Sequence, residues 1–220
     1  MDGVQDLVQA WRALLQRHCD SPRAEAVGRA MLARWSEPHR RYHDVAHLRD
    51  VLGRIDELAD HADDADAVRL AAWYHDVIYD ARPDDEERSA RQAEAELGGL
   101  GLPASLVAEV ARLIRMTVEH DPAPGDRDAE VLSDADLAAL AVPPEEYRRN
   151  SAAIRAEYSH VPEEKFRAGR ARVIRALLGG PGLFRTPAAR RRWEAAARAN
   201  MTAELKTLTG DVDTGSHGSG

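Results

Sequence analysis

Apolar residues recur every three or four positions along almost the whole chain, and no stretch alternates as a half-buried strand would. Because this is the period of an amphipathic helix, the sequence predicts a succession of helices joined by short loops. The expected helices cover residues 4–15, 22–35, 48–58, 68–79, 85–97, 106–118, 133–140, 144–158, 163–178 and 187–208. The pattern therefore predicts an all-α fold.

The segment 68–79 differs from the others because it is apolar on nearly every face, which is typical of a helix at the centre of a bundle. Gly98 and Gly99 are expected to end the helix that begins at residue 85. Without repeats or a long linker, residues 1–208 are expected to form one domain. Residues 209–220 have almost nothing to bury and are expected to be a disordered tail.

Composition narrows the classes of protein that fit. The formal net charge is −8, and the 30 Lys and Arg residues are scattered, which disfavours binding to duplex nucleic acid. No apolar run approaches the roughly 20 residues that cross a bilayer, so no membrane association is expected. The acidic start of the chain is unlike a secretory signal, and the one cysteine, Cys19, suits a reducing compartment. We expect a cytoplasmic protein.

The apolar segment 68–79 carries His75 and Asp76 side by side. Burial of an unpaired carboxylate costs several kcal/mol, so a buried Asp76 requires a cation, a group of hydrogen-bond donors or water. A divalent metal would satisfy both residues, since imidazole nitrogens and carboxylate oxygens are common ligands of zinc, manganese and iron. Taken alone, the pair is better explained by a hydrogen-bonded histidine at a helix end beside a capping aspartate.

Further candidate ligands lie on either side of this pair. His43 and His47 are four residues apart at the start of a predicted helix, so they would share one helix face. His120 ends the sixth predicted helix, where a dipole interaction would also explain it. Asp134 and Asp136 open the predicted helix 133–140, where Ser133 and Asp136 also fit a capping box that needs no metal.

In order, His47, His75, Asp76 and Asp136 resemble the metal-ligand motif of the HD-domain superfamily of metal-dependent phosphohydrolases, and in particular its bacterial branch of predicted phosphohydrolases. The resemblance covers roughly residues 4–208. Its matching segments are RYHDVAH at 41–47, WYHDVIYD at 73–80, DEERSA at 85–90, LSDADL at 132–137, FRAGR at 166–170 and LFRT at 183–186. It implies a single HD-type helical bundle with additional C-terminal helices.

The resemblance also implies roles for the candidate residues. His47, His75 and Asp136 would hold a first ion, and Asp76 would reach it and bridge toward a second. His120 would bind the second ion or protonate the leaving oxygen. His43 competes with His47 for the first position and Asp134 with Asp136 for the last; the apolar positions that follow His47 and Asp136 favour these two.

The expected reaction is hydrolysis of a phosphate ester or anhydride of a small, nucleotide-like molecule by metal-activated water. Manganese, zinc, iron, cobalt or nickel would suit the ligands. Cations that could hold substrate phosphate are Arg41, Arg49, Arg115, Lys165 and Arg170. The alternatives are a di-iron oxygenase of the same superfamily and a non-catalytic nucleotide-sensing domain. The sequence identifies neither the substrate nor the oligomeric state.

Overall fold

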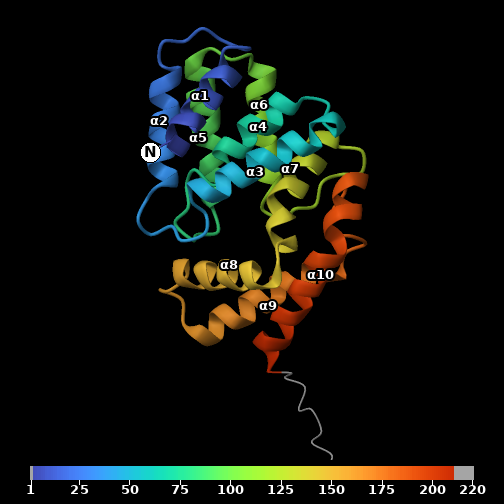
Figure 1. Ribbon diagram of the computed structural model, residues 1–220. Coiled ribbons are helices and arrows are strands. Elements are labelled where there is room, and N and C mark those ends of the chain that lie inside the picture. Colours follow the sequence, from blue (N-terminus) through green and yellow to red (C-terminus); the bar gives the residue numbers. More distant parts are fainter. Residues whose placement is uncertain (1, 211–220) are drawn as a thin grey trace, which may run out of the picture.

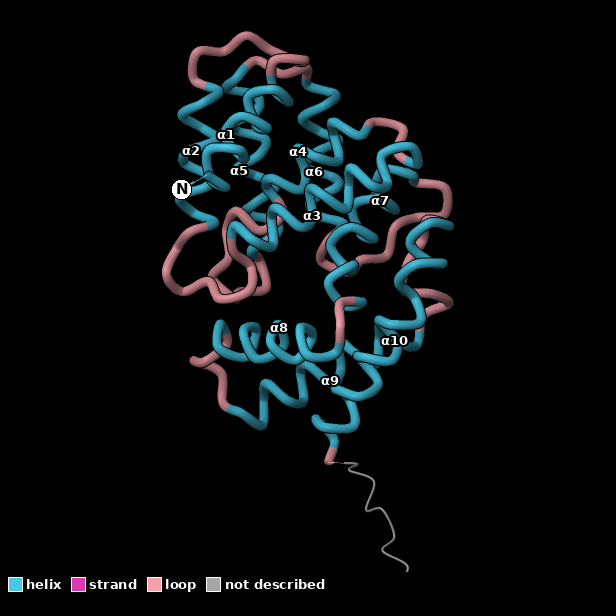
Figure 2. The backbone as a smooth tube through the Cα atoms, viewed as in Figure 1, coloured by secondary structure: helices cyan, strands magenta, loops and turns pink. Residues whose placement is uncertain are grey.

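The structure, a computed structural model, describes residues 2–210, and the part of the predicted tail from residue 211 onward lies outside the described residues. The prediction of an all-α fold is confirmed: the described residues form helices and contain no strand (Figures 1 and 2). The α-helices are α1 (Asp2–Leu15), α2 (Ala24–Trp35), α3 (Val45–Leu58), α4 (Ala65–Tyr74), α5 (Asp85–Leu100), α6 (Ala104–Met116), α7 (Arg127–Leu137), α8 (Pro144–Glu157), α9 (Glu163–Gly179) and α10 (Pro187–Thr209). Two short 3-10 helices, η1 (Ala59–His61) and η2 (Ala138–Ala141), extend α3 and α7.

Helix α4 lies at the centre of a bundle made by α1–α7, with α3, α6 and α7 packed around it (Figure 1). Leu70, Ala71 and Tyr74 are fully buried, as the apolar character of this segment predicts. The adjoining pair α1–α2 packs closely because Gly28 lies under the Trp11 ring, where a Cβ would come within 2.3 Å of Cδ1. The indole of Trp11 also donates to Ala24 O at 2.7 Å and contacts the Trp73 ring.

The C-terminal helices form a second region. Helices α8 and α9 and the C-terminal half of α10 lie beside one another below the bundle, while the N-terminal half of α10 runs up along it (Figure 1). Their core is small, with Tyr147 the only buried residue of α8 and Ala171 and Ile174 the only ones of α9. None of the described helices has the combination of length and apolar character that a bilayer span requires.

Several helix boundaries differ from the predicted ones, and the contacts explain three of these differences. Helix α4 ends at Tyr74, not at residue 79, because His75 Nδ1 binds Ala72 O, the carbonyl that the next helical amide would need. Helix α5 continues through Gly98 to Leu100, which is buried, and ends at Gly101 in the left-handed conformation (φ 90°). Helix α7 begins at Arg127 under an Asp126 cap, so Ser133 and Asp136 are not a capping box.

Candidate metal centre

Side chains from three helices meet at one point of the bundle. His47 comes from the first turn of α3, His75 from the C-cap of α4 and Asp136 from the last turn of α7. One ligand atom from each of the three lies within 4.8 Å of the other two, a spacing that could hold a metal ion. The structure thus brings together residues that are 89 positions apart in the chain (from 47 to 136).

The two imidazoles leave nitrogens without hydrogen bonds inside the protein. His47 Nε2 and His75 Nε2 are both buried, and neither has a hydrogen-bond partner. Asp136 Oδ1 lies 3.1 Å from His47 Nε2 and 3.7 Å from His75 Nε2, but neither approach satisfies the geometry of a hydrogen bond. Because a buried polar atom without a partner is costly, two such atoms beside one carboxylate fit a site that binds a cation.

The hydrogen bond of His75 sets which of its nitrogens can bind a metal. Its Nδ1 donates to Ala72 O at 2.8 Å, so the proton is on Nδ1 and Nε2 presents its lone pair to Asp136. The Trp35 ring packs against both imidazoles, with centroids 5.5 Å from His75 and 6.2 Å from His47, and its indole donates to Trp73 O. These contacts fix the rings in place.

Asp76 lies in the turn that follows α4, at the edge of the cluster. Its Oδ2 is 3.3 Å from His75 Nε2 and 3.9 Å from His47 Nε2. Asp76 is therefore close enough to join the three central side chains. It is not a residue of the buried helix that the apolar pattern predicts, because the chain has already left the helix there.

His120 lies on the other side of Asp136, with its Nε2 3.3 Å from Asp136 Oδ2 and its Nδ1 3.3 Å from Ser133 Oγ. Its φ of 50° is in the left-handed region, which non-glycine residues rarely adopt. Such strain persists where surrounding contacts hold a residue in place. His120 is thus positioned beside the cluster.

The charge state of Asp136 follows from its neighbours. Burial by itself raises the pKa of this carboxyl, but its close contacts with the His120 and His47 rings and the nearby His75 ring outweigh burial and hold the pKa well below its usual range. Asp136 is therefore a carboxylate at neutral pH. Nearby Glu86 differs, because burial and the charges of Asp76 and Asp85 raise its pKa.

The two competing candidates have other partners. His43 Nδ1 binds Glu157 Oε2 at 2.7 Å, and the His43 ring stacks on Tyr79 with centroids 4.2 Å apart. Asp134 is fully buried and accepts the amides of Arg185 and Thr186, each at 2.7 Å. It ties the loop between α9 and α10 to α7. Neither His43 nor Asp134 belongs to the three clustered residues.

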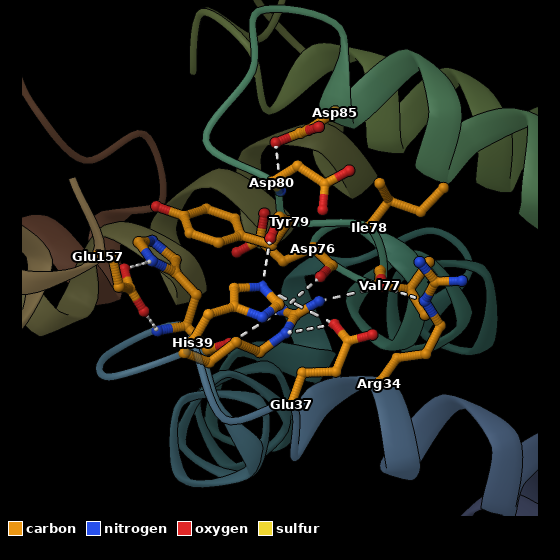
Figure 3. A network of polar contacts seen from close by, with 12 residues as sticks. Arg34, Glu37, His39, Asp76, Val77, Ile78, Tyr79, Asp80, Asp85 and Glu157 are labelled. Atoms are coloured by element: carbon orange, nitrogen blue, oxygen red, sulfur yellow. Dashed lines mark hydrogen bonds and ion pairs between the residues drawn. The ribbon is translucent and has the colours of Figure 1, made fainter. Parts of the chain in front are cut away.

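A polar network that the sequence analysis does not identify holds the turn after α4 (Figure 3). Arg40 is 5% exposed, and its guanidinium donates to the carbonyls of His43, Asp76 and Val77 at 2.8–3.1 Å. Burial lowers the pKa of Arg40 despite the charge of Asp76. The network thereby joins the loop before His47 to the turn that carries Asp76.

Glu157, at the end of α8, completes this network. Its Oε1 accepts the amides of Arg41, Tyr42 and His43 at 2.7–3.0 Å, while Oε2 binds the His43 ring. Burial alone raises the pKa of Glu157, but His43 and the amides lower it to about 2. Since Glu157 is 114 residues from His43, no local sequence signal indicates the contact.

A cavity of about 490 Å³ adjoins the cluster on the side that faces α8 and α9. Its bundle wall includes His75, Asp76, Glu86, His120 and Asp136. Its opposite wall includes Ile154 and Tyr158 near the end of α8 and Lys165, Phe166, Gly169, Arg170, Arg172 and Val173 on α9. A smaller cavity of about 160 Å³ reaches His47 and Asp136 from the side of Arg41 and Asp50.

The five cations predicted to hold phosphate are in different settings. Lys165 and Arg170 line the larger cavity and Arg41 the smaller one. Arg170 already forms two bonds to Glu204, and Arg115 pairs with Glu87 and Glu94 at the surface. Arg49 is exposed on α3 and lines neither cavity. Arg172, which lines the larger cavity, is missing from the predicted set.

Comparison with known proteins adds no relative: no family model, no curated protein and no solved structure matches the chain.

Proposed function

We propose that the chain is a metal-dependent phosphohydrolase that cleaves a phosphate ester or anhydride of a small organic molecule. The observation that carries the proposal is the pair of buried, unpartnered imidazole nitrogens beside the Asp136 carboxylate. The adjoining cavity supports it, because it combines these ligands with cations on the opposite wall and has the volume of a small-molecule site. The order of the ligands along the chain, which resembles that of HD-domain phosphohydrolases, supports the reaction class.

His47, His75 and Asp136 would hold a divalent ion, with Asp76 close enough to complete the set. When bound, such an ion lowers the pKa of a coordinated water and neutralises phosphoryl oxygens. The residues of the chain supply the other requirements. Hydrogen bonding of Nδ1 keeps the lone pair of His75 Nε2 directed toward the cluster, and Asp136 stays ionised because the imidazoles stabilise its charge.

His120 borders both the cluster and the cavity, so its ring could exchange a proton with a group bound there. Arg40 and Glu157 are positioning residues: they hold the loop before His47 and the turn that carries Asp76, and neither lines the larger cavity.

The test is metal content and hydrolysis in the same samples. Protein purified with manganese, zinc or iron should retain the ion and hydrolyse members of a panel of phosphorylated small molecules. His75→Ala and Asp136→Asn should each abolish turnover. Each should also lower metal affinity by at least roughly 10–100-fold, the loss that follows when a residue that only orients a metal ligand is removed. Asp56→Asn, which removes an exposed acid on α3, is the matched control and should change neither. Ligand variants that keep both the ion and the activity would refute the proposal.

A further inference from the structure

The face of α9 that borders the larger cavity carries two cations without a hydrogen-bond or ion-pair partner among the described residues. These are Lys165 and Arg172, which are exposed and line the cavity. Two neighbouring arginines are paired: Arg155 binds Glu163 at 2.7 Å, and Arg170 binds Glu204 at 2.9 Å. The region thus neutralises its other cavity-side arginine but leaves these two charges available.

The spacing of the two residues lets them act together. Positions 165, 169 and 172 follow one another at intervals of four and three, so they share one face of α9. Gly169 lies between the cations, and a Cβ built there meets no atom within 4 Å. The helix therefore presents a positive charge on either side of an open space, with no side chain between them.

The opposite wall has the reverse character. Asp76, Glu86 and Asp136 line it. A phosphate bound at the cluster would face the metal ligands, so it would not neutralise the two cations of α9. The wall formed by α8 and α9 also carries aromatic side chains, among them Tyr158 and Phe166, whose ring centroids are 5.9 Å apart. The cavity therefore has an acidic wall at the cluster and an opposite wall that combines cations with apolar side chains.

We propose that this cavity binds an organic phosphate that carries a second phosphate group, and that Lys165 and Arg172 hold this second group. The assignment of the first phosphate as the one that reacts rests on the proposed function. Binding of the second group does not, because it depends only on α9. The shared chemistry is a second phosphate, either adjoining the first in a diphosphate or on another carbon of the molecule.

The binding experiment uses calorimetry on the full chain in chelator, so that no turnover takes place. The probes are adenosine 5′-diphosphate and adenosine 3′,5′-bisphosphate, which separate the two arrangements of the second phosphate. The double variant Lys165→Met/Arg172→Gln should bind the preferred probe at least 10-fold more weakly than wild type. The matched control is Arg175→Gln, which removes an exposed cation of α9 that does not line the cavity, and it should bind as wild type does. Equal binding by the double variant would overturn the proposal.

The kinetic experiment uses the manganese-loaded enzyme. Wild type should have a kcat/KM at least 10-fold higher for the preferred two-phosphate probe than for adenosine 5′-monophosphate, and the double variant should lose this ratio. A ratio near one in wild type contradicts the proposal that a second phosphate is bound, but does not contradict the proposed hydrolase function. Absence of turnover on every probe removes the proposed function, and the calorimetric comparison then decides the binding role of α9 alone.

Discussion

The bundle α1–α7 and the C-terminal region formed by α8, α9 and the end of α10 are stabilised in different ways. The bundle has a continuous apolar core in which Trp11, Trp35 and Leu70 are essentially fully buried. The C-terminal region buries few apolar side chains and instead centres on Glu204, which binds Arg170, Tyr147 and Ser151. Charge-assisted hydrogen bonds thus replace much of the apolar packing there.

The difference matters because the candidate site lies between the two regions. All the clustered metal-ligand candidates belong to the bundle, whereas the cationic wall of the cavity belongs to α9. A tightly packed bundle keeps ligand atoms at fixed separations. A region with fewer buried contacts opens locally at lower free energy, so the cavity wall is expected to move more readily than the metal ligands.

The largest expected loss of stability comes from shortening a buried side chain in the bundle core. Leu70 is fully buried in α4, and Leu70→Ala should lower the global free energy of unfolding by about 3–5 kcal/mol. Ile174→Ala is the matched change in α9; it should cost about 2 kcal/mol and accelerate amide exchange mainly in α8 and α9. Chemical denaturation and hydrogen exchange measure both. Equal losses spread over the same amides would contradict a division into two regions.

The next effect concerns Glu157, the carboxylate that joins the regions. Because its folded pKa of about 2 lies below the ordinary Glu value, its ionised form stabilises the fold. The contribution is complete above about pH 4.5 and is lost as pH falls toward 2; it amounts to on the order of 3 kcal/mol. Denaturant unfolding between pH 2 and 6 measures it. Glu157→Gln should flatten the acid part of this curve, and an unchanged curve would argue against the assigned role.

Some features of the fold and of the candidate site can be predicted from the sequence, and others depend on contacts between distant residues. The apolar period predicts the helices because it is a local signal, whereas the ligand set at 47, 75, 76 and 136 follows from its resemblance to a family motif; of these four, residues 47, 75 and 136 cluster in the structure. The early end of α4 depends on the competition of His75 Nδ1 for a carbonyl, which periodicity does not encode. The role of Glu157 depends on a contact across 114 residues. Arg172 resembles any other exposed arginine until the cavity is known.

A smaller effect is expected at the centre of the C-terminal region. Glu204→Gln removes the charge that pairs with Arg170, whose guanidinium is largely buried, and should cost about 2 kcal/mol. The loss should appear as faster exchange in α8, α9 and the end of α10, with little change in the bundle. Glu163→Gln, which breaks the exposed pair with Arg155, is the control and should stay within about 0.5 kcal/mol. A loss shared evenly with the bundle amides would count against separate stabilisation.

The smallest expected change in stability comes from the same substitution, Gly→Ala, made once in each region. Gly53 lies inside α3 and Gly169 inside α9, and a Cβ at either position meets no atom within 4 Å. Alanine restricts the unfolded chain, so each Gly→Ala change should stabilise its helix by about 0.5–1 kcal/mol. Gly53→Ala should raise the global free energy of unfolding. Gly169→Ala should instead slow exchange within α8 and α9 and leave the global value nearly unchanged, since that region opens before the bundle unfolds. If both variants raised the global value equally, the two regions would unfold as one unit, and the cavity wall would be as fixed as the ligands it faces.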